Sequence, residues 1–187
     1  VLAGNIDEFD GAYMMTRLVD YIVEHLSQQI KAGCDTVQVF DSWASDLGEE
    51  HIIPYCYEPT AQIVERLRAL HPDVGIIVFP RLIGEEINNF SKYVNADCIS
   101  LSDDMKTDWI LKRMGSQCLQ GGIPPQVLLS ERKEEIIRGT VPMIRQMKDC
   151  AYVVNLAHGI NKETPVENVR FFIEIVKRNR ENITRET

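Results

Sequence analysis

The stretch HPDVGIIVFPRLIGEEINNFSKYVNADCISLS, residues 71–102, decides the fold class. Its run GIIVF, at 75–79, is almost continuously apolar, which predicts a short strand buried on both faces. A helical segment is expected at about 84–94, and the run CISLS at 98–102 predicts a second buried strand. Buried strands that alternate with helices indicate a parallel sheet covered by helices.

The same alternation extends along the chain in both directions. Upstream, apolar residues recur every four positions from Ala12 to Gly33, as in an amphipathic helix that ends at a glycine. The other expected elements are, in order, the strand TVQVF at 36–40, a helix at 51–70, a helix at 104–114, the strand QCLQG at 117–121, a helix at 130–148, the strand YVVNL at 152–156 and a helix at 165–182. The sequence therefore predicts five strands separated by helices.

The start of the last helix has a specific signature. Thr164-Pro165-Val166-Glu167 fits a capping box, in which the Thr hydroxyl and the Glu carboxylate accept hydrogen bonds from otherwise unpaired amides. Proline is tolerated there because its missing N–H has no helical partner to lose. We expect the helix to begin at this box.

Two closures of a parallel sheet compete. A doubly wound sheet that binds a nucleotide usually has a glycine-rich phosphate-binding turn after its first strand. The corresponding segment here, FDSWASDLG at 40–48, has no G-x-G-x-x-G motif. An eight-stranded βα barrel needs about 250 residues, and this chain holds about five units. We therefore expect an α/β fold that is a partial (β/α)8 TIM barrel, with about the last five βα units, and residues 1–187 as part of one domain. Residues upstream of Val1 or another copy are expected to cover the open edge.

Composition excludes several classes of function. The formal net charge is −8, with 20 Lys and Arg against 28 Asp and Glu, and polyanion-binding surfaces need clustered basic residues. We therefore expect neither a nucleic-acid partner nor a membrane surface. No run reaches the roughly 18 apolar residues of a membrane helix, and the N-terminus lacks the pattern of a signal peptide. A cytoplasmic location is the expectation.

The cysteines and histidines give no support for a metal or disulfide site. The five cysteines are far apart and form no C-x-x-C pair, which is typical of reduced and mostly buried thiols. The four histidines show no H-E-x-x-H spacing. We predict no metal.

Polar residues directly after the strands are the candidates for chemistry, because catalytic residues of βα barrels lie at the carboxyl ends of the strands. This rule selects Asp41, Ser42 and Trp43, then Arg81, then Asp103 and Asp104, then 120–124, and finally 155–159.

Five stretches at these places resemble one known family. They are GCDTVQVFDSWAS, IIVFPRLIG, CISLS, CLQGGIPP and VVNLAHGINKETPVENVRFF, and together they resemble uroporphyrinogen decarboxylase. The resemblance implies the C-terminal part of a TIM barrel that removes CO₂ from the four acetate side chains of uroporphyrinogen III, giving coproporphyrinogen III without metal or organic cofactor. It also implies a homodimer.

The resemblance assigns roles to two residues. Ser42 is implied as a hydrogen-bond donor to a substrate carboxylate. His158 is implied to bind carboxylate or to manage a proton, since imidazole titrates near neutrality. Two structural alternatives remain open: Ser42 could cap the following turn, and His158 could pack under the last loop with one ring N–H bonded to backbone.

Other candidates have weaker roles. Arg81 stands where the family often has lysine, so it could bind a substrate propionate or acetate, or could be a surface residue. For Asp103 and Asp104 we favour caps of the helix expected at 104. Trp43 is expected to be a wall or packing residue.

The chain departs from the family pattern in places. It reads LQGGIPP instead of LQGNLDP, with Gly122 and Pro124 replacing polar residues, whereas Ser45 and Ala157 are small replacements of glycine. The arginine-rich motif and the aspartate that holds the pyrrole N–H groups have no counterpart in this chain. We therefore expect the 187-residue chain alone to have no useful decarboxylase activity.

Two other functions are considered. A corrinoid-type methyltransferase of the same superfamily would hold zinc through an H-x-C pair, but FPRLIG, at 79–84, contains neither residue. A non-catalytic half-barrel, which binds tetrapyrroles or regulates another protein, is suggested by LQGGIPP and by the absent upstream motifs.

Overall fold

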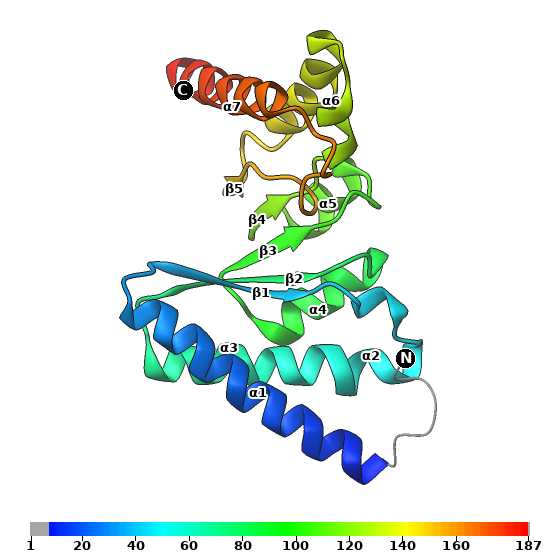
Figure 1. The fold of residues 1–187 in the computed structure, drawn as a ribbon, viewed down its shortest axis with the longest axis vertical. Helices are drawn as coiled ribbons and strands as arrows, with labels where there is room; N and C mark the ends of the chain where they lie inside the picture. Colours follow the sequence, from blue (N-terminus) through cyan, green and yellow to red (C-terminus); the bar gives the residue numbers. More distant parts are fainter. Residues whose placement is uncertain (1–7, 187) are drawn as a thin grey trace. The chain divides into compact units, whose positions relative to one another are not determined.

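The computed structural model describes residues 8–186, and the chain divides into two compact units, 1–97 and 98–187. Figure 1 shows strands with helices beside them in each unit. The strands follow chain order, β1-β2-β3-β4-β5, and the strand pairs within each unit are parallel. This order, with helices between the strands, is that of successive βα units of a TIM barrel, and it confirms the predicted fold class.

Within residues 8–97, the first unit contains two parallel strands and four α-helices, with short 3₁₀ and π-helical turns between them. Its elements are α1 (Glu8–Lys31), β1 (Thr36–Asp41), η1 (Ala44–Asp46), α2 (Glu49–Ile52), η2 (Ile53–Tyr57), α3 (Glu58–Leu70), β2 (Gly75–Pro80), η3 (Gly84–Glu86) and α4 (Ile87–Val94). The register pairs Thr36 with Gly75 and continues to Asp41 with Pro80. Helices α1 and α3 pack against each other.

Alternation along β1 and β2 builds the core of the first unit. Val37 and Val39 are buried while Phe40 is exposed, and Ile76 and Val78 are buried on the paired strand. Residues two apart on a strand lie on one face, so the valines share a face. Burial of each such side chain contributes about 1.5–3 kcal/mol, which fixes the register.

The helix expected at 51–70 is interrupted by the π-helical turn η2. The N–H of Glu58 donates to the carbonyl of Ile53, five residues back, and Pro59 has no N–H to donate to Tyr55. The turn therefore holds one residue more than an α-helical turn. Cys56 and Tyr57 are its buried residues.

The second unit contains the three remaining strands. Its elements are β3 (Cys98–Leu101), α5 (Thr107–Met114), β4 (Cys118–Gly121), η4 (Pro125–Leu129), α6 (Lys133–Gln146), β5 (Tyr152–Val153) and α7 (Val166–Glu186). β3 pairs with β4 from Cys98–Cys118 to Leu101–Gly121, and β4 pairs with β5 through Leu119–Tyr152 and Gln120–Val153. An isolated parallel bridge between Ile123 and Leu156 prolongs this last pairing.

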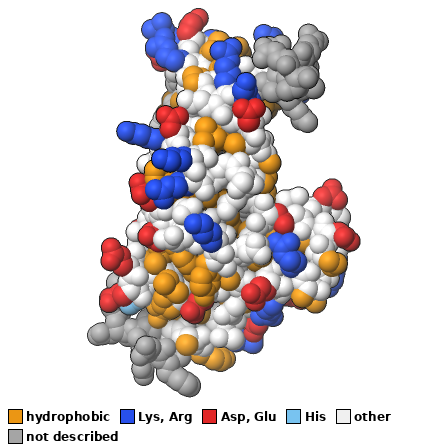
Figure 2. Space-filling view, turned by 180° about the vertical axis from the view of Figure 1, so that it is seen from behind, with side chains coloured by type: hydrophobic (Ala, Val, Ile, Leu, Met, Phe, Trp, Pro, Cys, Tyr) orange, Lys and Arg blue, Asp and Glu red, His pale blue; other side chains and the backbone are white. Residues whose placement is uncertain are grey.

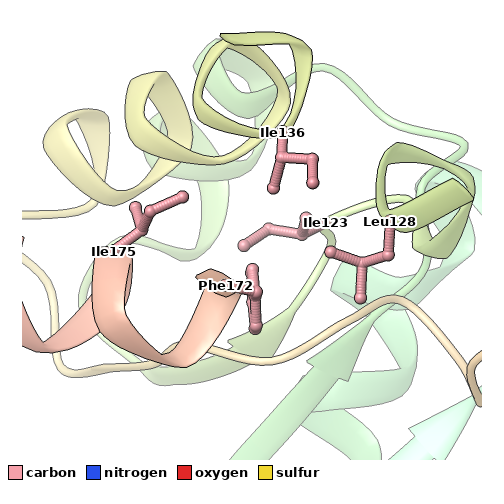
Figure 3. Close-up of a cluster of buried hydrophobic side chains, with 5 residues drawn as sticks. All are labelled: Ile123, Leu128, Ile136, Phe172 and Ile175. Carbon is pink, nitrogen blue, oxygen red and sulfur yellow. The ribbon is translucent and has the colours of Figure 1, made fainter. Parts of the chain in front are cut away.

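A hydrophobic cluster joins η4, α6 and α7. Figure 3 shows its five side chains converging from the loop after β4, η4, α6 and α7: Ile123, Leu128, Ile136, Phe172 and Ile175. The first three are completely buried. Burial of these apolar surfaces is the main force that holds the two helices together.

Beside this cluster, Asn168 links three segments by hydrogen bonds. Its Nδ2 donates to the carbonyls of Leu128 (2.8 Å) and Ser130 (2.9 Å), and its Oδ1 accepts from the Lys133 ammonium at 2.9 Å. The side chain is only 5% exposed. Asn168 thus satisfies two carbonyls at the end of η4, which otherwise lack a helical donor.

Two expectations about helix starts are wrong. α5 begins at Thr107 with Lys106 at its N-cap, so Asp103 and Asp104 lie too far upstream to cap it. The Thr164 hydroxyl is buried without a hydrogen bond among the described residues. The first helical amides bond to the Pro165 carbonyl instead, which makes Pro165 the N-cap and places Thr164 one residue too early for a capping box.

We predict that Asn168→Ala destabilises the protein by about 2–3 kcal/mol, because it leaves the buried carbonyls of Leu128 and Ser130 without their side-chain donor. Urea unfolding measures the loss. Asn179→Ala is the matched control, since Asn179 lies on the same helix and its amide donates, within the described part of the chain, to the carbonyl of Ile175 in that helix. Its effect should stay within about 0.5 kcal/mol. Equal losses for the two variants would contradict the linking role of Asn168.

Candidate functional site

In the first unit, the carboxyl ends of β1 and β2 bring two predicted site residues together. Asp41 pairs with Pro80, and the N–H of Arg81 donates to the carbonyl of Asp41 at 3.0 Å. Ser42 and Arg81 therefore both follow directly from the last paired residues of the two strands. We call this group, Asp41 to Trp43 with Arg81, the β1–β2 edge.

The Ser42 hydroxyl is presented to solvent at this edge. Ser42 is exposed, and its hydroxyl makes no hydrogen bond to any group that the structure describes. The short helix η1 that follows has Trp43 at its N-cap and no side-chain cap, so the capping alternative for Ser42 is wrong. Trp43 itself is 74% exposed. In this structure the indole is therefore not a packing residue of the first unit.

Asp41 carries a half-buried carboxyl beside Ser42. Burial raises the pKa of this carboxyl, while hydrogen bonds from the Cys56 thiol and the Trp43 backbone N–H lower it in part. Burial and the neighbouring Asp41 carboxylate raise the pKa of the Cys56 thiol far above its ordinary value. The thiol is therefore protonated at neutral pH and donates to the carboxylate.

Cys56 is the residue at this edge that the sequence did not single out. Its burial was expected, and it is 1% exposed, but its contact with Asp41 was not. The interrupted helix could have signalled it, since π-helical turns are frequent at functional sites. Two prolines, Pro54 and Pro59, stand on either side of Cys56 in the sequence.

The loop after Arg81 turns sharply. Leu82 has φ 58° and Gly84 has φ 57°. The left-handed conformation costs a residue with a Cβ roughly 1–2 kcal/mol, so Leu82 is held there by its surroundings. Backbone strain of this kind gathers at functional sites. Arg81, half-buried, therefore leaves the strand end on a constrained backbone.

In the second unit, the end of β4 is crowded by backbone. A Cβ on Gly121, which has φ 80°, would lie 3.0 Å from the carbonyl oxygen of Leu101 and 3.1 Å from that of Leu156. The Tyr152 hydroxyl donates to the Gly121 carbonyl at 2.6 Å, and burial raises the pKa of this phenol. Only glycine combines this positive φ with such close contacts.

At Gly122, where the chain departs from the family pattern, a side chain of α6 lies next to the backbone. This residue also has a positive φ, 83°, and a Cβ on it would clash with the Cε of Met143. Met143 on α6 thus occupies the space that a side chain at 122 would need. Any residue other than glycine there requires Met143 to move.

His158 lies beyond β5, on a segment fixed to the end of β4. The N–H of Ala157 donates to the carbonyl of Ile123 at 2.7 Å. The half-buried His158 ring has Nδ1 2.9 Å from the carbonyl of Gly159, and a carbonyl only accepts, so Nδ1 carries the hydrogen. In the neutral ring, Nε2 is then the acceptor. The hydrogen bond from Nδ1 to the Gly159 carbonyl is the backbone bond expected for a packed histidine, and it leaves Nε2 able to accept a hydrogen bond from a ligand.

The predicted residues therefore fall into two groups. Ser42 and Arg81 lie at the β1–β2 edge of the first unit. His158 lies after β5 in the second unit, and Gln120 and Gly121 end the adjacent strand β4.

Among the side chains that the structure describes, those of residues 11–179, no group of three or more His, Cys, Asp or Glu is arranged to hold a metal ion. None of the helices in that range is long and apolar enough to cross a membrane. On the face drawn in Figure 2, basic and acidic side chains are interspersed rather than separated into a basic stripe.

Comparison with known proteins places these features in a family. The sequence model of the family described as Uroporphyrinogen decarboxylase (URO-D) matches residues 9–179. The uroporphyrinogen decarboxylase of Cereibacter sphaeroides is 31% identical over 166 residues, which are 88% of this chain and 48% of that protein. The one from Orientia tsutsugamushi is 34% identical over 160 residues (86% and 47%), and that from Paracoccus denitrificans is 32% identical over 167 residues (89% and 48%).

The chain thus spans about half the length of the curated relatives it matches. The family match includes both groups of candidate residues, from the β1–β2 edge to the segment after β5. The chain belongs to the uroporphyrinogen decarboxylase family.

Proposed function

We propose that the protein containing this chain decarboxylates uroporphyrinogen III. It removes CO₂ from the four acetate side chains and yields coproporphyrinogen III, with no metal or organic cofactor. One observation carries the proposal: in a chain of this family, Ser42 and Arg81 directly follow β1 and β2, and His158 comes two residues after the parallel bridge at Leu156 that prolongs β5. Barrel enzymes keep their catalytic groups at such strand ends.

The reaction requires positioned carboxylates and a stabilised cationic pyrrole. Protonation of a ring carbon makes the pyrrole an electron sink, the bond to the acetate carboxylate breaks with release of CO₂, and the resulting methylene takes up a proton to become methyl. The protein contributes orientation and electrostatics. In our proposal the Ser42 hydroxyl donates to a substrate carboxylate, and the Arg81 guanidinium binds a propionate or acetate as a fork-shaped donor.

His158 is proposed to bind a carboxylate or to transfer a proton. Its Nδ1–H bond to Gly159 holds the ring, so Nε2 has a defined direction. As a neutral ring Nε2 accepts a proton, and as imidazolium it donates to a carboxylate. Both uses agree with the tautomer that the Gly159 carbonyl selects.

We further propose that residues 1–187 are the C-terminal part of a single TIM-barrel domain, and that the whole protein is a cytoplasmic homodimer. Light scattering of the full-length protein tests the assembly, and a mass equal to one chain contradicts the dimer.

A second candidate is a non-catalytic half-barrel that binds tetrapyrroles. The observation that favours it is the loop after β4, where Gly122 replaces a polar residue and Met143 fills the space next to it. In that case binding of a porphyrinogen survives without turnover.

For the full-length protein, we expect Ser42→Ala to lower kcat/KM about 10- to 100-fold, the loss of one hydrogen bond to a charged group. His158→Asn should lower it by about 10²- to 10⁴-fold if the ring transfers a proton. Product is measured under anaerobic conditions as coproporphyrin after oxidation. Ser45→Ala and His25→Asn are the matched controls. Ser42→Ala or His158→Asn activity equal to that of its control excludes the assigned role.

For the isolated 187-residue chain, we expect no measurable coproporphyrinogen, because the resemblance places the anchor for the pyrrole N–H groups outside it. The same anaerobic assay measures this, with the full-length protein as positive control. Turnover by the isolated chain contradicts the expectation. Binding of uroporphyrinogen by a full-length protein that never forms product favours the half-barrel instead.

A further inference from the structure

Tyr57 joins the turn after β1 to the loop after β2. It belongs to the π-helical turn η2 and is 4% exposed. Its hydroxyl donates to the Glu86 carboxylate at 3.0 Å, and the backbone carbonyl oxygen of Glu86 lies 3.1 Å from the same hydroxyl. Burial, together with the Glu86 carboxylate, raises the pKa of this phenol, so the hydroxyl is a donor at neutral pH. The reaction as proposed so far gives this contact no role.

Aromatic contacts fix the Tyr57 ring independently of its hydroxyl. The ring packs edge-on against Phe90, with centroids 5.2 Å apart and planes at 84°, and its centroid lies 5.6 Å from that of Tyr93. Both partners belong to α4, and Phe90 is 1% exposed. Such contacts stabilise the ring whether or not the oxygen is present. Replacement of Tyr57 by phenylalanine therefore removes the hydrogen bonds to Glu86 and leaves the packing.

Glu86 ends the loop that begins with Arg81. At the start of this segment, the N–H of Arg81 donates to the carbonyl of Asp41 at 3.0 Å. At its end, the Tyr57 hydroxyl contacts both the carbonyl and the carboxylate of Glu86. We call residues 81–86 the Arg81 loop. Both of its ends are thus tied to residues that end β1 or follow it.

Two left-handed residues, Leu82 and Gly84, lie between these ties. Their φ values are 58° and 57°, and a residue with a Cβ favours other conformations. The geometry of the Arg81 loop therefore depends on contacts with the rest of the first unit. Asn89 strengthens the tie at Glu86, since its amide donates to the same carboxylate oxygen at 3.2 Å.

The Arg81 guanidinium is left for a ligand. Arg81 is half-buried, and its side chain forms no hydrogen bond or ion pair with any group that the structure describes. The Glu86 carboxylate, on the same loop, is engaged by Tyr57 and Asn89 instead. Binding of an anion by such a guanidinium costs less when its backbone is already held in place. The ties of the loop therefore affect how tightly Arg81 binds.

We propose that Tyr57 is a positioning residue, which through Glu86 holds the Arg81 loop in the conformation from which the Arg81 guanidinium binds a substrate carboxylate. This inference rests on the proposed function for the role of Arg81. The tie between Tyr57 and Glu86 itself is a property of the fold that is measurable without substrate.

The first experiment measures trypsin cleavage of the Arg81–Leu82 bond in the full-length protein, followed by mass spectrometry. Cleavage after Lys106 is the internal reference, because Lys106 is exposed and precedes α5 in the second unit. Cleavage after Arg81 requires the loop to open. Tyr57→Phe should therefore raise the rate at Arg81 relative to Lys106 by about 3- to 10-fold, the change in open population expected for the loss of one hydrogen bond.

Tyr93→Phe is the matched control. The Tyr93 ring lies against Tyr57, and its hydroxyl forms no hydrogen bond to a group in the described part of the chain. Its cleavage ratio should stay within about 2-fold of the wild type. Glu86→Gln keeps an acceptor oxygen for Tyr57 and should also stay within about 2-fold, whereas Glu86→Ala should raise the ratio. An unchanged ratio in Tyr57→Phe, or an equal rise in Tyr93→Phe, overturns the tie.

The second experiment compares steady-state kinetics in the full-length protein. Tyr57→Phe should raise KM for uroporphyrinogen III about 3- to 10-fold and leave kcat within about 2-fold, as expected when an arginine binds a carboxylate equally in the ground state and the transition state. In the Arg81→Ala background, Tyr57→Phe should add little. An equal further rise in that background means that Tyr57 acts independently of Arg81, which overturns the positioning role. A fall in kcat at unchanged KM does the same.

These readouts separate the two proposals. If the wild-type full-length protein shows no decarboxylation, the proposed function fails, and the cleavage ratio still decides whether Tyr57 holds the Arg81 loop. If the ratio rises in Tyr57→Phe while KM stays unchanged, the positioning role is overturned and the proposed function stands. If Tyr57→Phe does not fold, the comparison of Glu86→Ala with Glu86→Gln, at an exposed position, gives the same decision.

Discussion

The register between β1 and β2 is the constraint on which the β1–β2 edge depends. Parallel strands end at the same edge, so the pairing of Asp41 with Pro80 brings Ser42 and Arg81 to neighbouring strand ends. A shift by one residue would turn Val37 and Val39 out of the core. The burial of the two valines therefore determines the strand register. The same register determines that Ser42 and Arg81 are the residues at the strand ends.

In the second unit, much shorter strands place the candidate residues at the strand ends. β5 contributes two ladder pairs, and the bridge from Ile123 to Leu156 and the bond from Ala157 to Ile123 take over where the ladder stops. The neighbouring backbone segments lie close together at the end of β4, so a side chain at position 121 would contact the carbonyl oxygens of Leu101 and Leu156. The segment that carries His158 is thus held by backbone contacts rather than by regular sheet.

Local patterns predicted the strands, because a short run rich in β-branched residues such as GIIVF at 75–79, with Pro72 and Pro80 on either side, is typical of a buried strand. They also predicted that Ser42 and Arg81 follow strand ends. They failed where tertiary contacts decide: α7 takes Pro165 rather than Thr164 as its N-cap, and the helix after residue 51 contains a π-helical turn. The contact of Cys56 with Asp41 joins separate segments, and no spacing rule announces it.

Two features at or next to the β1–β2 edge reduce the stability of the fold: the partly buried carboxyl of Asp41 and the left-handed backbone of Leu82. The raised pKa of Asp41 means that the folded state favours the protonated carboxyl, so the contribution of this group to stability is present at low pH and is lost as pH rises through the folded pKa. Leu82 adds a left-handed backbone. A chain selected for stability alone would remove both costs, and natural proteins retain such costs mainly where function needs them. Their coincidence beside Ser42 and Arg81 therefore supports this edge as part of a site by an argument that does not use the family resemblance.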